Sequence, residues 1–131
     1  MSNQREPVTA IGAPAAVGPY VHAVKAAGLL WCSGQIPLHP ETGELVGETT
    51  AEQAGRCLEN LQAVCAAAGA TLADAVKITV YLVEMDDFAA VNEVYASFFE
   101  QEPPARVAVA VARLPRGAAD AEALPAAQWP E

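Results

Sequence analysis

Residues 76–83 read Val-Lys-Ile-Thr-Val-Tyr-Leu-Val and decide the fold class. Their β-branched content and alternation predict a strand. The segment before them changes period, with apolar positions at helical spacing: Ala54, Leu58, Leu61, Cys65 and Ala68. Two overlapping capping-box patterns, Thr49 with Glu52 and Thr50 with Gln53, predict where this helix begins, and Gly69 marks its end.

A second helix and a second strong strand follow residues 76–83. Asp86 or Asp87 can cap a helix whose apolar face recurs at steps of three, four and three: Phe88, Val91, Tyr95 and Phe98. Pro103 and Pro104 end it. Ala105 to Ala112 then runs as a continuous Val/Ala strand. Helix, strand, helix and strand therefore follow one another over 60 residues of chain, which predicts an α+β domain.

The N-terminal third and the C-terminal segment add weaker strands. Short apolar runs predict a strand from Val8 to Ile11 and a hairpin that joins residues 22–26 to 29–33 around Gly28. Residues 34–47 read as a loop, and a last strand is predicted from Ala119 to Leu124. Because 131 residues leave little room for two cores, residues 1–131 are expected to form a single domain.

The strand at 105–112 is apolar on both faces, which bears on assembly. Such strands are normally covered on both sides. Two helices can cover one face of a five- or six-stranded sheet but not two, so the other face needs protein from another chain. The sequence therefore predicts a closed homo-oligomer. The alternative is that small alanine side chains simply leave a shallow solvated face.

Composition limits the class of function. Seven Lys and Arg against sixteen Asp and Glu give a net charge of −9, which argues against nucleic-acid binding. No apolar run is continuous enough for a membrane span, and the first residues have no secretory pattern. Three cysteines without CxxC spacing fit neither a disulfide framework nor a zinc site, so we expect a cytoplasmic protein without a metal.

Arg106 is the strongest candidate for chemistry. It opens the most apolar strand of the chain, where its charge needs an anionic partner. One interpretation is an ion pair with one of the sixteen acidic residues. The other is a bidentate clamp on the carboxylate of a ligand, because the guanidinium group matches that geometry.

Four other polar residues could accompany Arg106, each with an ordinary explanation. Tyr20 follows a stiff Gly-Pro pair and could be a half-buried aromatic residue, while Ser33 could be a turn serine. Asn92 lies on the Phe88/Tyr95 side of the second helix, where a buried amide needs partners. Glu122, in the last weak strand, could be solvent-exposed.

Several blocks together resemble the Rid (reactive intermediate deaminase, YjgF-like or RidA) family. The resemblance runs in family order from about residue 14 to residue 122 and is carried by Pro14–Val24, Ser33–Pro37, Asn60–Leu61, Val76–Leu82, Asp87–Tyr95, Pro104–Arg106 and Val111–Pro115. It implies a chorismate-mutase-like fold assembled as a homotrimer with clefts between subunits. It also implies hydrolysis of 2-imino or 2-enamino acids, such as 2-iminobutanoate and 2-iminopropanoate, to 2-keto acids and ammonia, without a metal or organic cofactor.

The resemblance also implies residue roles. Arg106 matches the arginine that grips the substrate carboxylate, and Tyr20 and Ser33 match polar residues lining the cleft. Asn92 matches a helix position near the cleft, and Glu122 a glutamate that positions water.

The chain departs from the family pattern in two places. Glu122 matches only if one residue is missing after Gly117; without that gap an alanine takes the position. Val107 and Ala108 stand where many members carry a polar residue or cysteine, which makes the pocket plainer. These departures keep two alternatives open: a deaminase of a larger enamine or aminomuconate-type acid, and a non-enzymatic trimer that binds small carboxylates.

Overall fold

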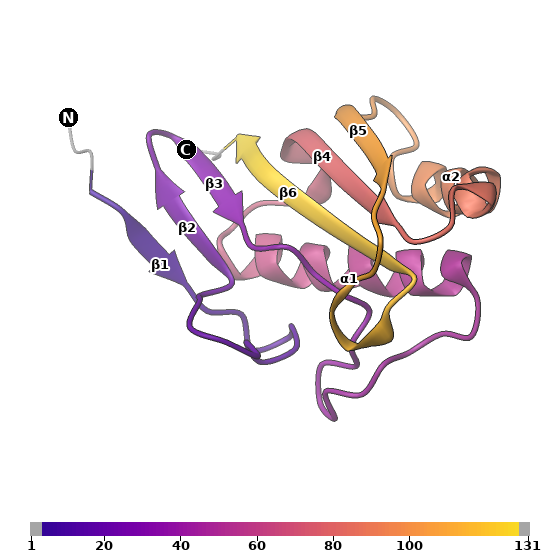
Figure 1. Ribbon diagram of the computed structural model, residues 1–131. Coiled ribbons are helices and arrows are strands. Elements are labelled where there is room, and N and C mark those ends of the chain that lie inside the picture. Colours follow the sequence, from indigo (N-terminus) through magenta and orange to yellow (C-terminus); the bar gives the residue numbers. More distant parts are fainter. Residues whose placement is uncertain (1–3, 129–131) are drawn as a thin grey trace.

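The computed structural model describes residues 4–119 in full and the backbone of residues 120–128. Its elements follow the predicted order of three strands, helix, strand, helix and two strands (Figure 1). They are β1 (Glu6–Val8), β2 (Ala23–Ala26), β3 (Leu29–Cys32), α1 (Thr50–Ala67), β4 (Ala75–Leu82), α2 (Phe88–Phe98), β5 (Ala105–Ala110) and β6 (Asp120–Gln128). Short 3₁₀ turns lie at Leu72–Asp74, Met85–Asp87 and Pro115–Gly117.

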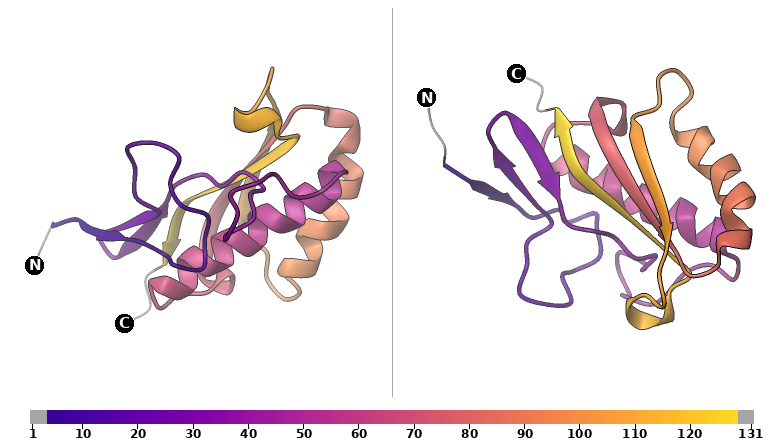
Figure 2. Two further views of the ribbon diagram at one scale, coloured as in Figure 1. Left: turned by 90° about the horizontal axis from the view of Figure 1, so that it is seen from below. Right: turned by 45° about the horizontal axis from the view of Figure 1, so that its top comes forward.

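All six strands form one mixed sheet in the order β1-β2-β3-β6-β4-β5. β4 and β5 are parallel and are joined through α2, whereas the other pairs are antiparallel. β6, the most C-terminal strand, lies between β3 and β4. Both helices pack on the same face of the sheet (Figure 2). The predicted α+β class, with two helices on one face of a mixed sheet, is confirmed.

Helix α1 forms as its sequence predicts. The Thr49 hydroxyl accepts a hydrogen bond from the Glu52 N–H at 3.1 Å and lies 3.2 Å from the Glu52 carboxylate, so the predicted N-terminus is confirmed. The apolar positions at helical spacing are buried against the sheet. Gly69, with φ of +80°, follows the helix in the left-handed conformation that favours glycine.

Helix α2 begins where predicted, but the side-chain hydrogen bond expected at its N-terminus does not form. Asp87 occupies the N-cap position, yet its side chain makes no capping hydrogen bond. The Asp87 carboxylate accepts instead from the Thr50 hydroxyl at 2.5 Å. This bond joins the N-terminal ends of the two helices.

Several strand boundaries differ from the prediction, by one residue at β4 (Ala75–Leu82) and by more at the strands below. The first strand is Glu6–Val8, because pairing to β2 begins at Glu6, and Ile11 lies fully exposed in a turn. β5 ends at Ala110. β6 extends to Gln128 because it pairs with both β3 and β4. The predicted hairpin is confirmed: Ala27 and Gly28 both have positive φ, as a two-residue turn between twisted strands requires.

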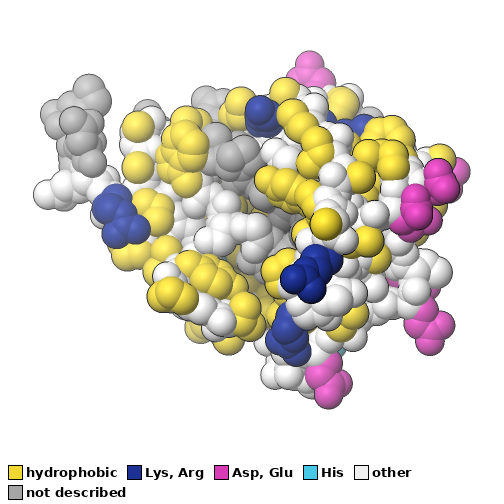
Figure 3. All heavy atoms as spheres, viewed as in Figure 1, with side chains coloured by type: hydrophobic (Ala, Val, Ile, Leu, Met, Phe, Trp, Pro, Cys, Tyr) yellow, Lys and Arg dark blue, Asp and Glu magenta, His cyan; other side chains and the backbone are white. Residues whose placement is uncertain are grey.

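The sheet face opposite the helices is uncovered in the single chain. It exposes large apolar side chains, among them Trp31 (43%), Val107 (41%) and Val109 (38%). Figure 3 views this face, where hydrophobic side chains gather over the strands and acidic ones lie near its margin. We call it the open face. The prediction that two helices cover only one side is confirmed.

Candidate active site

Arg106 turns toward α2 and is held there by three side chains. It stands opposite Ile78 in the β4–β5 register, and Ile78 is fully buried under the helices. Arg106 Nη1 donates a hydrogen bond to Asn92 Oδ1 at 2.7 Å. Its Cζ lies 4.9 Å from the ring centroid of Tyr95 and 5.3 Å from that of Phe88. Such cation–π contacts fix a guanidinium without neutralising it.

Whether a carboxylate of the chain binds Arg106 decides between the internal ion pair and the clamp on a ligand. Among the side chains that the structure describes, no carboxylate forms an ion pair with Arg106. The interpretation as an internal ion pair is therefore not supported within that part of the chain. The charge of the guanidinium remains available to an anion from outside.

Arg106 also lines a cavity of about 350 Å³. Its walls are mainly apolar, and its other lining residues are Asn92, Tyr95, Ala96, Phe99, Pro103 and Pro104. Apolar walls with few polar groups are typical of small-molecule sites. We call this the arginine cavity.

Tyr20 and Ser33 line a different cavity, of about 390 Å³, which we call the tyrosine cavity. Tyr20 is 43% exposed, and its hydroxyl accepts a hydrogen bond from the Val17 N–H at 3.2 Å. The Ser33 hydroxyl donates to the Val21 carbonyl at 2.6 Å. The remaining lining residues are Val17, Gly34, Ile36 and Pro115.

No residue lines both the arginine cavity and the tyrosine cavity. The first is built on α2 and β5 and the second on the loops around β2 and β3, and in the sheet β6 and β4 separate β3 from β5. One chain therefore brings Arg106 and Asn92 together, and Tyr20 and Ser33 together, but gives no single cavity with all four. The predicted site is present as two separate parts.

The backbone of Glu122 lies on β6 opposite Val80, and Ala123 lies opposite Thr79. The side chain of Glu122 is outside the residues that the structure describes in full. Its predicted role with water therefore stays a prediction.

Sequence reasoning missed two groups of residues. The first is the ring pair Phe88 and Tyr95, which it assigned only to the core face of α2. The predicted need of Asn92 for a partner is fulfilled, but only the structure identifies that partner as Arg106.

The second group consists of buried polar residues behind the tyrosine cavity. Asn60 is fully buried, and its Nδ2 donates to the carbonyls of Leu38 at 3.0 Å and Ile36 at 3.4 Å. Its Oδ1 accepts from Arg56 Nε at 3.1 Å. The buried Gln53 side chain donates to the Gly47 carbonyl and accepts from the Ala119 N–H. A buried amide needs hydrogen-bond partners such as these. The spacing of the apolar residues in the helix gives no signal for them.

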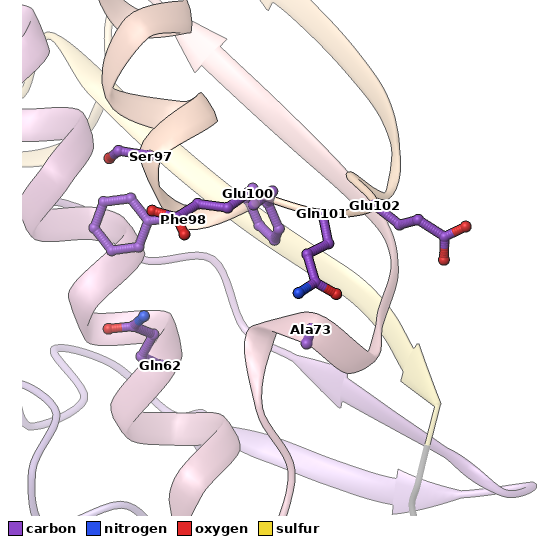
Figure 4. Close-up of a pocket in the computed structure, with 8 residues that line it drawn as sticks. Gln62, Ala73, Ser97, Phe98, Glu100, Gln101 and Glu102 are labelled. Atoms are coloured by element: carbon purple, nitrogen blue, oxygen red, sulfur yellow. The ribbon is translucent and has the colours of Figure 1, made fainter.

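A third cavity, of about 460 Å³, lies where α2 ends (Figure 4). Residues 97–102 form one side, and Gln62 of α1 and Ala73 form the other. Glu100 and Glu102 give it acidic character. None of the predicted site residues lines it.

The three cysteines are core residues and none of them forms a disulfide with another residue that the structure describes. Cys57 and Cys65 are fully buried, and only 9% of Cys32 is accessible. A hydrogen bond with Cys65 and burial together raise the pKa of the Cys32 thiol.

Among the side chains of residues 4–119, no group of three His, Cys, Asp or Glu residues is placed to hold a metal ion. None of the helices described there is long and apolar enough to cross a bilayer.

The sequence and the fold match a known protein family. The family model described as Endoribonuclease L-PSP matches residues 10–122. The chain belongs to this family, the YjgF/RidA/RutC or Rid family. A RutC family protein of Pyrococcus horikoshii is 48% identical over 112 residues, covering 86% of this chain and 89% of that protein.

Two further relatives have informative names. TdcF of Escherichia coli, whose name assigns it as a reactive intermediate deaminase, is 44% identical over 107 residues, covering 79% of this chain and 82% of TdcF. A crystal structure of TdcF with bound serine has a TM-score of 0.86 at 39% identity and covers 94% and 98% of the two chains. RidA from an Antarctic Psychrobacter has a TM-score of 0.88 at 41% identity, with the same coverage. These neighbours share the fold described above.

Proposed function

We propose that this protein hydrolyses 2-imino and 2-enamino acids to 2-keto acids and ammonia, with Arg106 binding the substrate carboxylate. The observation that carries the proposal is the state of Arg106. Its guanidinium is held by a neutral amide and two rings, lines an apolar cavity, and has no carboxylate partner among the fully described residues. A bidentate carboxylate is the ligand such a fixed guanidinium matches.

The complete site is proposed to lie between two copies of the chain. The arginine cavity of one copy would face the tyrosine cavity of the next, which would join the two parts that a single chain keeps apart. The open face, with its exposed tryptophan and valines, supports an assembly through this surface. A closed ring of identical contacts covers every such face, and we propose a homotrimer because the family resemblance implies three subunits.

The reaction needs positioning more than a strong nucleophile. Water adds to the electrophilic C2 of the protonated imine, and its proton passes to a base, for which we propose Glu122 or a backbone carbonyl. The base returns this proton to the nitrogen of the resulting amino alcohol. The C–N bond then breaks as the hydroxyl group gives its proton to the same base, and the products are ammonia and a 2-keto acid. Holding the carboxylate and water in line can lower the barrier by about 7–11 kcal/mol at best.

The electrostatic attraction that captures the substrate comes, in this proposal, from Arg106. A net charge of −9 gives little long-range attraction for an anionic substrate. The local field of a half-buried guanidinium then supplies both binding and orientation. Loss of Arg106 is therefore expected to weaken binding and rate together.

Two observations support this function over RNA cleavage, the activity in the name of the matching family model. TdcF is named a deaminase, and the serine in its crystal structure carries a carboxylate like the proposed substrates. Both ring nitrogens of His22 are within hydrogen-bond distance of backbone atoms, and His39 lies in the loop before α1, so the two histidines are not built as a catalytic pair. We propose a cytoplasmic enzyme that removes reactive imines and uses neither cofactor nor nucleic acid.

A coupled assay tests the proposal. An amino-acid oxidase generates 2-iminobutanoate or 2-iminopropanoate in situ, and loss of the imine is followed with wild-type protein and Arg106→Lys. Lysine keeps the charge but removes the fork, so we expect at least about a tenfold loss of kcat/KM with the oligomer intact. Unchanged turnover in Arg106→Lys would contradict the carboxylate clamp.

The same assay separates the two alternatives. Turnover confined to larger enamine acids would identify a specialised deaminase. Thermal stabilisation by 2-ketobutyrate without any ammonia release would identify a carboxylate-binding protein.

A further inference from the structure

His22 is a buried histidine whose ring connects two distant points of the backbone. Only 4% of the residue is exposed. Its Nδ1 accepts a hydrogen bond from the Ala10 N–H at 2.8 Å, and its Nε2 lies 2.7 Å from the Pro14 carbonyl, to which it donates. Since an amide N–H needs an acceptor and a carbonyl needs a donor, the neutral ring with its proton on Nε2 satisfies both.

The backbone around His22 reaches the tyrosine cavity. The His22 carbonyl accepts from the Ser33 N–H at 2.9 Å. The carbonyl of Val21, one residue earlier, accepts from the Ser33 hydroxyl at 2.6 Å. Tyr20 is only two residues away. His22 therefore holds the segment 10–14 through its ring and binds Ser33 through its backbone carbonyl.

The segment from residue 9 to residue 22 has no helix or strand to fix its course. Val17 and Tyr20, which line the tyrosine cavity from this segment, are 58% and 43% exposed and so gain little from core packing. An apolar side chain could fill the volume of His22 but could make neither hydrogen bond. The two ring bonds therefore fasten the segment 10–14, and together with the bonds from Ser33 they tie this wall of the cavity to the sheet.

We infer that His22 is a positioning residue, which holds Tyr20 and Ser33 in place for the reaction. This inference rests on the proposed function, in which the carboxylate is bound by Arg106 of another copy. Displacing Tyr20 and Ser33 then disturbs the reacting end of the substrate and leaves its carboxylate anchor intact. The effect should fall on kcat, and a displacement of 1 Å can cost about 100-fold in rate.

Three variants test the inference. His22→Leu removes both hydrogen bonds and keeps an apolar side chain of similar size. His22→Gln restores an acceptor and a donor on one amide group. Val64→Ala is the matched control, because Val64 is a fully buried residue of α1 that lines neither cavity, so the substitution lowers stability without touching the site. All three are assayed well below their melting temperatures.

We expect His22→Leu to lose about tenfold or more in kcat with less than about a threefold change in KM, and His22→Gln to recover most of the loss. Val64→Ala should keep the wild-type kcat despite a lower Tm. A kcat for His22→Leu equal to that of Val64→Ala, a loss confined to KM, or no recovery in His22→Gln would overturn the inference.

A readout without substrate separates this inference from the proposed function. If wild-type protein hydrolyses no imine, the proposed function fails, and hydrogen exchange at the Ser33 amide decides the role of His22. Exchange about tenfold faster in His22→Leu than in Val64→Ala would support it. Equal exchange in the two variants would overturn it.

Discussion

Asn92 Oδ1 lies 2.7 Å from Arg106 Nη1, so a neutral amide sets the position of the guanidinium. The neighbouring Tyr95 and Phe88 rings add attraction without adding negative charge. An aspartate at position 92 would hold Arg106 just as well and would also neutralise it. The difference between amide and carboxylate is what leaves this cation available to a ligand.

The first prediction follows from this pair. Asn92→Asp is nearly isosteric and places a carboxylate against Arg106, so substrate must compete with an internal anion. We expect kcat/KM to fall by about 10- to 100-fold, with stability unchanged or raised. Steady-state kinetics and thermal unfolding measure both quantities. Ala90→Asp, on the exposed side of α2, adds the same charge away from Arg106 and should keep the activity. Full activity in Asn92→Asp would contradict the role of Arg106.

The second prediction concerns the division of the site between copies. Chains carrying Arg106→Lys and chains carrying Tyr20→Ala should each be nearly inactive alone. When the two are unfolded together and refolded at equal amounts, random assembly should return about a quarter of wild-type activity, because some interfaces combine an intact arginine cavity with an intact tyrosine cavity. Mixtures no more active than their parents would show that each site uses residues of one chain.

The third prediction concerns the open face. Val109→Glu puts a charge among apolar side chains that an assembly would bury, so the oligomer should dissociate and activity should fall with it. Ala89→Glu, on the exposed side of α2, is the control and should leave both unchanged. Light scattering after size exclusion gives the mass of each species. An oligomer of undiminished mass in Val109→Glu would exclude this face as the interface.

The fourth prediction uses the raised pKa of Cys32. Below the ordinary thiol value of 9.0 the folded and unfolded chains both keep the proton, whereas above it only the unfolded chain releases it. The free energy of unfolding should therefore decline as pH rises above about 9, by up to about 1.4 kcal/mol per pH unit from this group. Urea unfolding at pH 8–10.5 should show a shallower decline in the double variant Cys32→Ala/Cys65→Ala, which removes both members of the thiol pair, than in wild type. Parallel declines would contradict the assignment.

The sequence predicts well whatever depends on local period. Leu58 and Leu61 lie on the buried face of α1, as their spacing predicts. β4 forms because the alternation of its residues matches the pleat of the sheet. The prediction is wrong where pairing with distant residues decides the bounds of a strand, as for Val8 to Ile11, where pairing with β2 sets the register.

The candidate site shows the same limit. The sequence could single out Arg106 and note that Asn92 needs a partner, but their contact depends on how α2 lies across β5. It also could not show that Tyr20 and Arg106 line different cavities, since that follows from the insertion of β6 between β3 and β4. Buried His22 and Asn60 form hydrogen bonds with backbone carbonyls and amides of loops, and these backbone groups leave no pattern in the sequence.

The place of β6 in the sheet also has a consequence for biosynthesis. β1 to β3 and the β4–β5 pair are neighbours only through β6, which leaves the ribosome after all of them. Until then the nascent chain holds two unjoined sheet fragments, each with a free hydrogen-bonding edge. The sheet therefore closes only after β6 has emerged from the ribosome, and chaperones that shield exposed strands would act before that point.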